Sequence, residues 1–416
     1  MTIKITVNLL LPVLLLLTIV ESRALARQGC EGLSIQLGPA ANTGGIPAVL
    51  ASHTLTLDPT WRSARLFFKS GEVLPDGSYL RVTSLDDMAV QNFTSAEIGE
   101  WRHSSAYFNT ATSHQLLLEL VCAPHTSTNQ VSVIEVCPGP GFAVDPACNL
   151  CVPQPPNSSE KWAARTIGVL VCSAAMYSTS GCLVSVLHCR GEVGDVAQFN
   201  TPPSTATGQI VHPSPQDQYI VSAIMKDPLG SSDWAVMRLG RSEGLTAFQR
   251  QGEVRRIGRA FSVAVGDPLR TVGYGAAVGA TGIGHAAQKD SPGAVVTLLS
   301  SIIFTHDGFV QAGNSGGGVV VRKSTSNPAA VEVLAAVVST ICDDGGGPVG
   351  SKCISIPWPV RHAPFLAAID SFCADCIRDC DGDGVISPAD RTILVNWIAT
   401  YNPMGDLTGN GFVDSA

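Results

Sequence analysis

The stretch Gly313-Asn314-Ser315-Gly316-Gly317 is the most informative part of this 416-residue chain. Glycines on both sides of Ser315 allow backbone conformations with positive φ and leave the turn open to close approach. In such a turn the N–H groups of Gly313 and Ser315 can together bind a negative charge that develops beside them. A serine hydroxyl stays protonated at neutral pH, so it becomes a nucleophile only next to a base.

Two earlier stretches supply that base and a group to orient it. His188 lies in Leu187-His188-Cys189, and Asp233 directly precedes the apolar run that begins at Trp234. The chain order is therefore His, Asp, Ser, and each residue stands beside a β-type apolar run. We expect His188 to take the Ser315 proton, while Asp233 holds the imidazole tautomer and stabilises its charged form.

The segment from about Trp162 to Ile369 resembles the trypsin-like (chymotrypsin-fold) serine endopeptidases, whose triad runs in this order. Three further motifs carry the resemblance: Cys172 and Cys189 bracket the histidine, Val272-Gly273-Tyr274-Gly275 matches a Gly-aromatic-Gly turn, and Val337-Val338-Ser339 matches a substrate-pairing strand. The resemblance implies a double β-barrel over 161–372 and cleavage of protein or peptide substrates through an acyl-enzyme. It also implies an oxyanion hole at Gly313 and Ser315, and no cofactor for catalysis.

The resemblance also implies particular disulfides and a substrate pocket. The expected disulfides are Cys172–Cys189 and Cys342–Cys353. Phe309, six residues before Ser315, predicts a pocket for apolar or small side chains, or a shallow pocket, and Ser339 is expected to contact substrate. Asn314 stands where members activated by cleavage carry a buried aspartate that must pair with a new N-terminal ammonium. A neutral amide needs no counter-charge, so we expect no such activation here.

Alternating short apolar runs also predict the secondary structure of this segment. Strands are expected over 219–225, 234–239 and 294–304, and a short closing helix over 363–369. No regular alternation of strands and helices is present, which argues against an α/β-hydrolase esterase, although residues 313–317 fit its Gly-x-Ser-x-Gly pattern. That fold also needs its acid and histidine after the serine, whereas both precede it here.

The beginning of the chain reads as a signal peptide, residues 1–26. Lys4 gives a positive start, Val7 to Val20 is mostly apolar, and Ala24-Leu25-Ala26 is a small-x-small cleavage site. A retained membrane anchor is the alternative, but no later stretch approaches the ~20 apolar residues of a spanning helix. Thirteen cysteines agree with an oxidising compartment. We therefore expect a secreted, extracellular protein with no membrane span after signal removal.

Residues 27–136 predict a β-sandwich that resembles the jelly-roll-like domains of some secreted peptidases. Short apolar runs alternate with turns, and Asp76-Gly77 predicts a hairpin between the runs 64–68 and 79–82. The domain could bind substrate or a cell surface, act as a removable pro-region, or simply pack against the rest. Residues 137–160 read as a Pro/Cys-rich linker, in which Cys148-x-x-Cys151 favours a disulfide over a metal site.

Residues 373–416 carry a pattern for calcium. Hard oxygen ligands recur at loop positions 1, 3, 5, 7, 9 and 12, which are Asp379, Asp381, Asp383, Val385 (through its carbonyl), Ser387 and Asp390. Ser387 then caps a predicted helix, and an incomplete second loop begins at Asp406. The pair of loops resembles a dockerin (dockerin type I-like) module, which implies a cohesin-like or cell-surface partner. A calcium-stabilised tail without a partner is the alternative.

The net charge of −8 excludes some partners. No basic stripe is present in the sequence, which argues against nucleic acid. Two functions remain: a secreted serine endopeptidase with this triad, or a non-catalytic peptidase-like binding protein anchored through its calcium module. The predicted fold is mainly β, with a chymotrypsin-like double barrel between a β-sandwich and a small α-helical EF-hand-like module.

Overall fold

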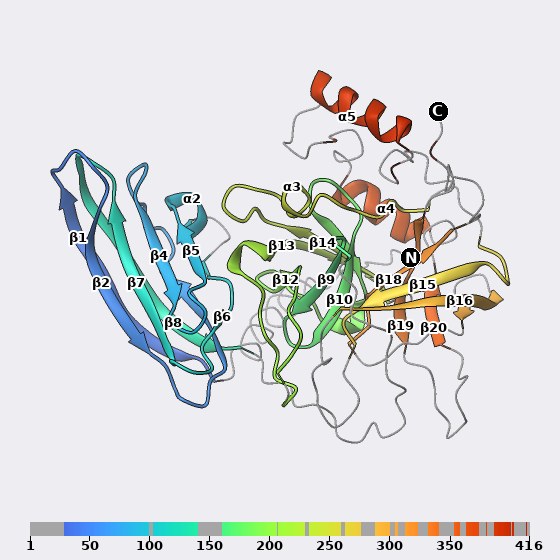
Figure 1. Ribbon diagram of the computed structural model, residues 1–416, viewed down its shortest axis with the longest axis horizontal. Coiled ribbons are helices and arrows are strands. Elements are labelled where there is room, and N and C mark those ends of the chain that lie inside the picture. Colours follow the sequence, from blue (N-terminus) through green and yellow to red (C-terminus); the bar gives the residue numbers. More distant parts are fainter. Residues whose placement is uncertain are drawn as a thin grey trace, which may run out of the picture.

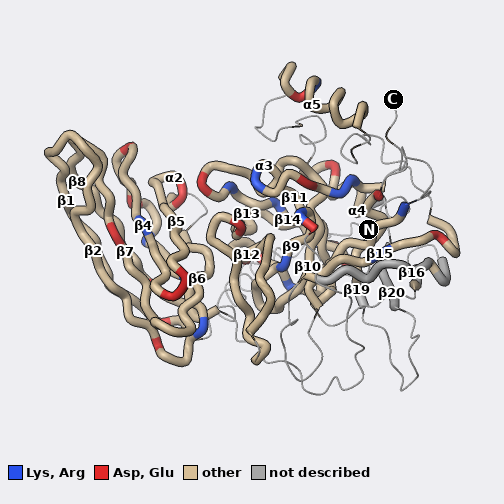
Figure 2. Tube along the Cα trace, in the orientation of Figure 1, with Lys and Arg blue, Asp and Glu red and all other residues tan. Residues whose placement is uncertain are grey.

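The computed structural model is mainly β, as expected (Figure 1). It describes residues 29–99, 103–139, 160–205, 207–228, 233–258, 263–275, 288–299, 304–306, 313–322, 332–340, 353–357, 363–373, 380, 387–400, 402 and 413. The expected signal peptide and most of the expected linker lie outside these residues. Acidic and basic residues are interspersed along the described chain (Figure 2).

Residues 29–139 form two four-stranded antiparallel sheets, and we call them the two-sheet domain. Its elements are β1 (Glu31–Asn42), β2 (Ala48–Thr56), β3 (Ser63–Phe68), β4 (Tyr79–Ser84), β5 (Val90–Phe93), α2 (Ser95–Ile98), β6 (Phe108–Asn109), β7 (Gln115–Cys122) and β8 (Thr126–Pro138). The strand orders are β1-β8-β3-β6 and β2-β7-β4-β5. One hydrophobic cluster, which includes Leu66, Leu80, Phe93 and Leu118, draws side chains from both sheets.

The expected hairpin at Asp76-Gly77 is wrong. Strand β3 pairs with β8 and β6, whereas β4 pairs with β5 and β7. The turn at Gly77, with φ of +78°, instead carries the chain from one sheet to the other. Both flanking strands send apolar side chains into the same core, so burial is satisfied without pairing between them. Strand β8 also runs past the expected boundary at 136, because Cys137 still pairs in register with Arg65 and forms a disulfide with Cys30.

Two closed six-stranded barrels follow. The first is built from β9 (Ala163–Ile167), β10 (Val171–Met176), β11 (Cys182–Ser185), β12 (Val196–Gln198), β13 (Gln218–Lys226) and β14 (Ala235–Leu239). The second is built from β15 (Pro268–Gly273), β16 (Lys289–Leu299), β17 (Phe304–His306), β18 (Gly318–Val321), β19 (Val333–Thr340) and β20 (Cys353–Pro357). A single buried cluster includes side chains of both, such as Val184, Tyr219, Val319 and Val337.

One strand prediction in the second barrel is wrong. The single strand expected over 294–304 is two strands, because Val296 of β16 pairs antiparallel with His306 of β17 and the chain must reverse between them. An unbroken apolar run does not reveal where a chain turns back.

Short helices complete the fold. They are the 3-10 turns η1 (Leu187–Cys189) and η2 (Pro215–Asp217) and the helices α3 (Ala247–Gln251), α4 (Ala363–Phe372) and α5 (Pro388–Ala399). The closing helix predicted over 363–369 is present as α4, and a disulfide joins Cys373, just after it, to Cys182 of β11. In α5, Trp397 packs edge-on against Phe248 of α3 with ring centroids 6.5 Å apart. None of the described helices has the length and apolar character needed to cross a membrane.

Candidate active site

His188 sits on a short 3-10 turn that follows β11. The turn ends because Arg190 adopts a left-handed conformation, with φ of +53°, and its N–H donates to the Leu187 carbonyl. Cys189 forms a disulfide with Cys172 of β10, the pairing that the resemblance implied. The histidine side chain is 43% exposed, so it can meet a bound molecule.

Asp233 holds His188 through two hydrogen bonds and the preceding residue, Leu187, through a third. Its Oδ2 lies 2.7 Å from His188 Nδ1, its Oδ1 accepts from the His188 N–H at 2.8 Å, and its carbonyl accepts from the Leu187 N–H at 3.1 Å. The backbone of Asp233 has φ of +50°, a strained conformation for a residue with a Cβ atom. The next residue, Trp234, stacks on Phe365 of α4, which supports Asp233 from behind. The carboxylate therefore fixes both the position of the turn and the orientation of the ring.

Ser315 lies on a turn between two glycines with positive φ, Gly313 at +89° and Gly316 at +84°. A Cβ atom on Gly316 would come within 2.1 Å of the Ser173 carbonyl oxygen, so only glycine fits there. The turn is anchored to the second barrel, since the Gly316 N–H donates to the Val338 carbonyl at 2.7 Å. Ser315 itself is partly buried.

Ser173 of β10 fixes the Ser315 turn from the first barrel, and sequence reasoning missed it. Its N–H donates to the Ser315 carbonyl at 2.8 Å, and its hydroxyl donates to the Gly313 carbonyl at 2.7 Å. The same hydroxyl accepts from the Tyr274 N–H at 2.8 Å. These contacts span 140 and 101 residues of sequence, so no local pattern reports them. Only the position of Ser173 beside Cys172 gave a signal.

Two N–H groups near Ser315 are free to bind a ligand. Within the described residues, neither the Gly313 N–H nor the Ser315 N–H donates a hydrogen bond. The Ser315 carbonyl lies 3.7 Å from Cys189 Sγ, which places the serine turn against the residue that follows His188. No hydrogen bond joins the Ser315 hydroxyl to the His188 ring in the described part of the chain. In peptidases without substrate such contacts are often long and tighten on binding.

Asn314 is buried beside the serine, with 4% of its surface exposed. Its side chain packs over the bare backbone of Gly273 and Gly275, where an added Cβ would come within 3.0 and 2.8 Å of Asn314 Oδ1. Among the described residues this oxygen has no hydrogen-bond partner. A charged aspartate at this position would therefore lack compensation, a cost that a neutral amide reduces.

Several expected site residues lie outside the described chain. They are Phe309, Cys342, Asp379, Asp381, Asp383 and Val385, together with the side chains of Ser339 and Cys353. Of the expected calcium ligands the structure describes Ser387 and Asp390. Asp390 is 3% exposed, and its two oxygens accept from the N–H groups of Cys380 and Ser387, both at 2.6 Å. The carboxylate expected to close the loop is thus held against both the start and the end of that loop.

Three comparisons relate the chain to known proteins. No family model and no curated protein matches the chain. Among solved structures it is similar to a Glu endopeptidase, with 16% identity over 52% of this chain and 91% of that one and a TM-score of 0.38. The protease Anisep from Arthrobacter nicotinovorans matches with 16% identity, 50% and 94% coverage and a TM-score of 0.37. An inactivated protease paralogue of the scabies mite matches with 15% identity, 51% and 98% coverage and a TM-score of 0.37.

The two closed six-stranded barrels define the architecture of this segment, which is a double β-barrel. At these identities and TM-scores the similar structures decide nothing about chemistry, and an inactivated protein is among them. The chemistry of the site depends on the residues of this chain.

Proposed function

We propose that the chain is a secreted serine endopeptidase that hydrolyses peptide bonds through an acyl-enzyme. The observation that carries the proposal is the contact of 2.7 Å between His188 Nδ1 and Asp233 Oδ2. Beside it lies a serine turn in which, among the described residues, the N–H groups of Gly313 and Ser315 donate no hydrogen bond. A carboxylate on Nδ1 leaves Nε2 as the basic nitrogen, which is the arrangement that activates a serine hydroxyl.

The proposed reaction has two halves. In the first, His188 Nε2 takes the proton from Ser315 Oγ as this oxygen attacks the substrate carbonyl carbon. The resulting oxyanion accepts hydrogen bonds from the N–H groups of Gly313 and Ser315, and His188 then donates its proton to the leaving amine as the C–N bond breaks. In the second half a water molecule, deprotonated by His188, attacks the acyl group and frees Ser315.

The remaining parts are proposed to serve export and attachment. Residues 1–26 would direct secretion, and 373–416 would form a dockerin-like module for a cohesin-like or cell-surface partner. Asp379, Asp381, Asp383, Val385, Ser387 and Asp390 would hold calcium, whose charge would offset their mutual repulsion. Asp390, which is buried and accepts hydrogen bonds from two backbone N–H groups, fits a closed loop of this kind. Calorimetric calcium uptake by the full chain, lost in Asp381→Asn, tests this part.

A fluorophosphonate probe that modifies activated serines tests the catalytic proposal. We expect stoichiometric labelling of the wild type and none of Ser315→Ala or His188→Gln. The matched control is Ser371→Ala, because Ser371 is an exposed serine of α4 whose hydroxyl, among the described residues, donates to the Ala368 carbonyl of its own helix. Failure to label the wild type, or equal labelling of Ser315→Ala, would remove the proposed triad.

One observation favours a second candidate, a non-catalytic peptidase-like binding protein anchored through its calcium module. Within the described residues the Ser315 hydroxyl makes no hydrogen bond to His188. A protein that only binds would use the surface around Ser315 to hold peptides without cleaving them. An unlabelled wild type that nevertheless binds peptides would support this second candidate.

A further inference from the structure

The two-sheet domain packs against the first barrel through a largely buried polar interface. Gln218 of β13, 1% exposed, bonds to both polar groups of the Tyr107 backbone: its Oε1 accepts from the N–H at 3.0 Å, and its Nε2 donates to the carbonyl at 2.8 Å. The side chain thereby takes the place of a neighbouring strand. Removing the two-sheet domain would take these two hydrogen bonds from Gln218 and leave only its bonds to Gln198 and to the Pro213 carbonyl among the described residues of the barrel.

The same recognition runs in the opposite direction at His212, a buried residue of the barrel. Asn109 of β6 accepts from the His212 N–H at 3.0 Å and donates to its carbonyl at 3.1 Å. The His212 ring stacks on Tyr107 with centroids 4.8 Å apart, and its Nε2 lies 3.0 Å from Ser63 Oγ. Each domain therefore uses an amide side chain to bind the backbone of the other.

An apolar contact completes this surface. Tyr107 forms a buried cluster with Ile167, Val196 and Ile220, which come from β9, β12 and β13. These three side chains stand outside the core that the two barrels share. Without Tyr107 these three side chains would be exposed to solvent. An exposed apolar patch of this kind is unfavourable for a barrel that separates from the two-sheet domain.

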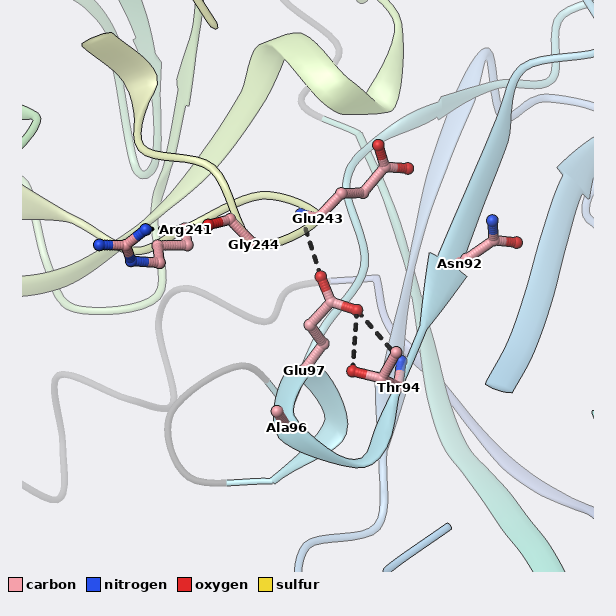
Figure 3. Close-up of a pocket in the computed structure, with 7 residues that line it drawn as sticks. All are labelled: Asn92, Thr94, Ala96, Glu97, Arg241, Glu243 and Gly244. Atoms are coloured by element: carbon pink, nitrogen blue, oxygen red, sulfur yellow. Dashed lines mark hydrogen bonds between the residues drawn. The ribbon is translucent and has the colours of Figure 1, made fainter. Parts of the chain in front are cut away.

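A second contact lies at the other end of the interface, beside a cavity of about 600 Å³ (Figure 3). Asn92, Thr94, Ala96, Glu97, Arg241, Glu243 and Gly244 line it. Glu97 of α2 accepts from the Glu243 N–H of the barrel at 3.0 Å and from the Thr94 N–H at 3.1 Å. The carboxylate is thus used to join the domains, and contact at two separate places opposes rotation of one domain on the other.

Arg65 connects this interface to the loop that carries His188. It belongs to β3, is 6% exposed, and its Nη2 donates to the Gly194 carbonyl at 2.7 Å. Gly194, with φ of +99°, lies in the segment that joins the His188 turn to β12. In the same segment Asp195 accepts from the Glu192 N–H at 2.8 Å. Burial raises the pKa of Asp195 to about 7, and the charge of Arg65 acts against that rise.

We propose that the two-sheet domain is a permanent part of the catalytic unit, in which Arg65 is a positioning residue for the loop that follows His188. The proposal rests on the proposed function, and it excludes the removable pro-region as a role for this domain. The contacts of Gln218 and Asn109 keep the domains together. The hydrogen bond from Arg65 to the Gly194 carbonyl holds the segment that follows His188, so that docking of the domain positions the histidine.

The first test asks whether the domains separate. A recognition site for a specific protease replaces residues 153–158, beyond Cys151, and the full chain is cut there. Reduced and unreduced gels establish that no disulfide joins the fragments. We expect the two fragments to co-elute in gel filtration at micromolar concentration. Separation into two species would overturn the proposal, and this result does not depend on catalysis.

The second test addresses Arg65 and uses Arg62→Ala as the control, because among the described residues the Arg62 side chain donates to the Ala111 carbonyl of its own domain and not to the barrel. We expect Arg65→Ala to lower kcat about 10-fold with little change in KM, since small displacements of catalytic groups are costly. Arg65→Lys should recover part of the loss. Equal kcat in the Arg65→Ala and Arg62→Ala variants would overturn the role of Arg65.

A spectroscopic readout separates this test from the proposed function. The His188 Nδ1–H, bonded to Asp233, should give a downfield proton resonance that is absent from His188→Gln. We expect this resonance to weaken or move in Arg65→Ala and to stay in Arg62→Ala. If the wild type fails to react with the phosphonate, the resonance still decides whether Arg65 positions the loop. An unchanged resonance in Arg65→Ala would refute the proposal.

Discussion

Replacing Gly316 by alanine tests whether the serine turn is fixed by steric fit between the barrels. The new Cβ would lie 2.1 Å from the Ser173 carbonyl oxygen and 2.2 Å from Ser185 Oγ. Neither atom can retreat easily, because the Ser173 carbonyl accepts from the Ser185 hydroxyl at 2.8 Å and both residues are buried in neighbouring strands. The turn itself must therefore move.

The size of the movement follows from the contact. A distance of 2.1 Å falls 0.9 Å short of the 3.0 Å below which Cβ contacts are essentially never seen. The Ser315 carbonyl is bonded to the Ser173 N–H at 2.8 Å, so a turn that backs away loses this anchor as well. Misplacing a reacting group by about 1 Å costs about 10²-fold in rate. We expect Gly316→Ala to react with the fluorophosphonate probe about 10²-fold more slowly than the wild type.

Gly252→Ala is the matched control. Gly252 also has positive φ, +75°, but a Cβ there would meet nothing within 4 Å. It therefore carries the backbone strain of a non-glycine residue without the clash, and its reaction rate should equal that of the wild type. A Gly316→Ala variant that reacts as fast as Gly252→Ala would refute the steric argument, and equal losses in both would assign the effect to strain alone.

Three further predictions concern the dyad and the interface. Asp233→Asn should lower kcat about 10⁴-fold with the near-UV spectrum unchanged, because the amide no longer holds the His188 tautomer; a loss below tenfold would contradict the role of the carboxylate. Gln218→Ala should cost about 2–5 kcal/mol in urea unfolding, since buried partners such as the Tyr107 N–H are left unsatisfied, whereas Gln36→Ala, an exposed control, should be neutral. Burial holds the pKa of His212 well below 6.5, so just below pH 6.5 the unfolded chain binds a proton on this ring and the folded chain does not. The free energy of unfolding should therefore fall by up to about 1.4 kcal/mol for each pH unit below 6.5. A pH dependence that His212→Asn leaves unchanged would show that this ring is not held neutral.

Local patterns were sufficient to predict several barrel strands and the closing helix. Tyr219–Met225 and Trp234–Leu239, expected as strands, agree with β13 and β14 to within one residue at each end. Apolar runs between turn residues fix such elements because burial acts on each run separately. The predicted helix cap at Ser387 also forms, with its hydroxyl accepting from the Ala389 N–H at 3.1 Å. Capping needs only neighbouring residues, so the sequence reports it.

Long-range contacts could not be predicted in the same way. Ser173 reaches Gly313 across 140 residues, and Gln218 reaches Tyr107 across 111. A serine or glutamine in a strand has the same local appearance whether it faces solvent or another domain. The resemblance to peptidases supplied His188, Asp233 and Ser315, but it said nothing of the residues that brace them. The residues that hold His188, Asp233 and Ser315 in place, such as Ser173, can therefore be identified only from the three-dimensional structure.

The disulfide between Cys182 and Cys373 has a consequence for a copy of this chain that is cleaved by a protease. It joins positions 191 residues apart, so its covalent ring contains the whole second barrel. One nick anywhere between these cysteines opens the ring without releasing a piece. On a denaturing gel such a molecule would migrate as two bands only after reduction. Without reduction, a cleaved copy would keep Ser315 covalently connected to His188.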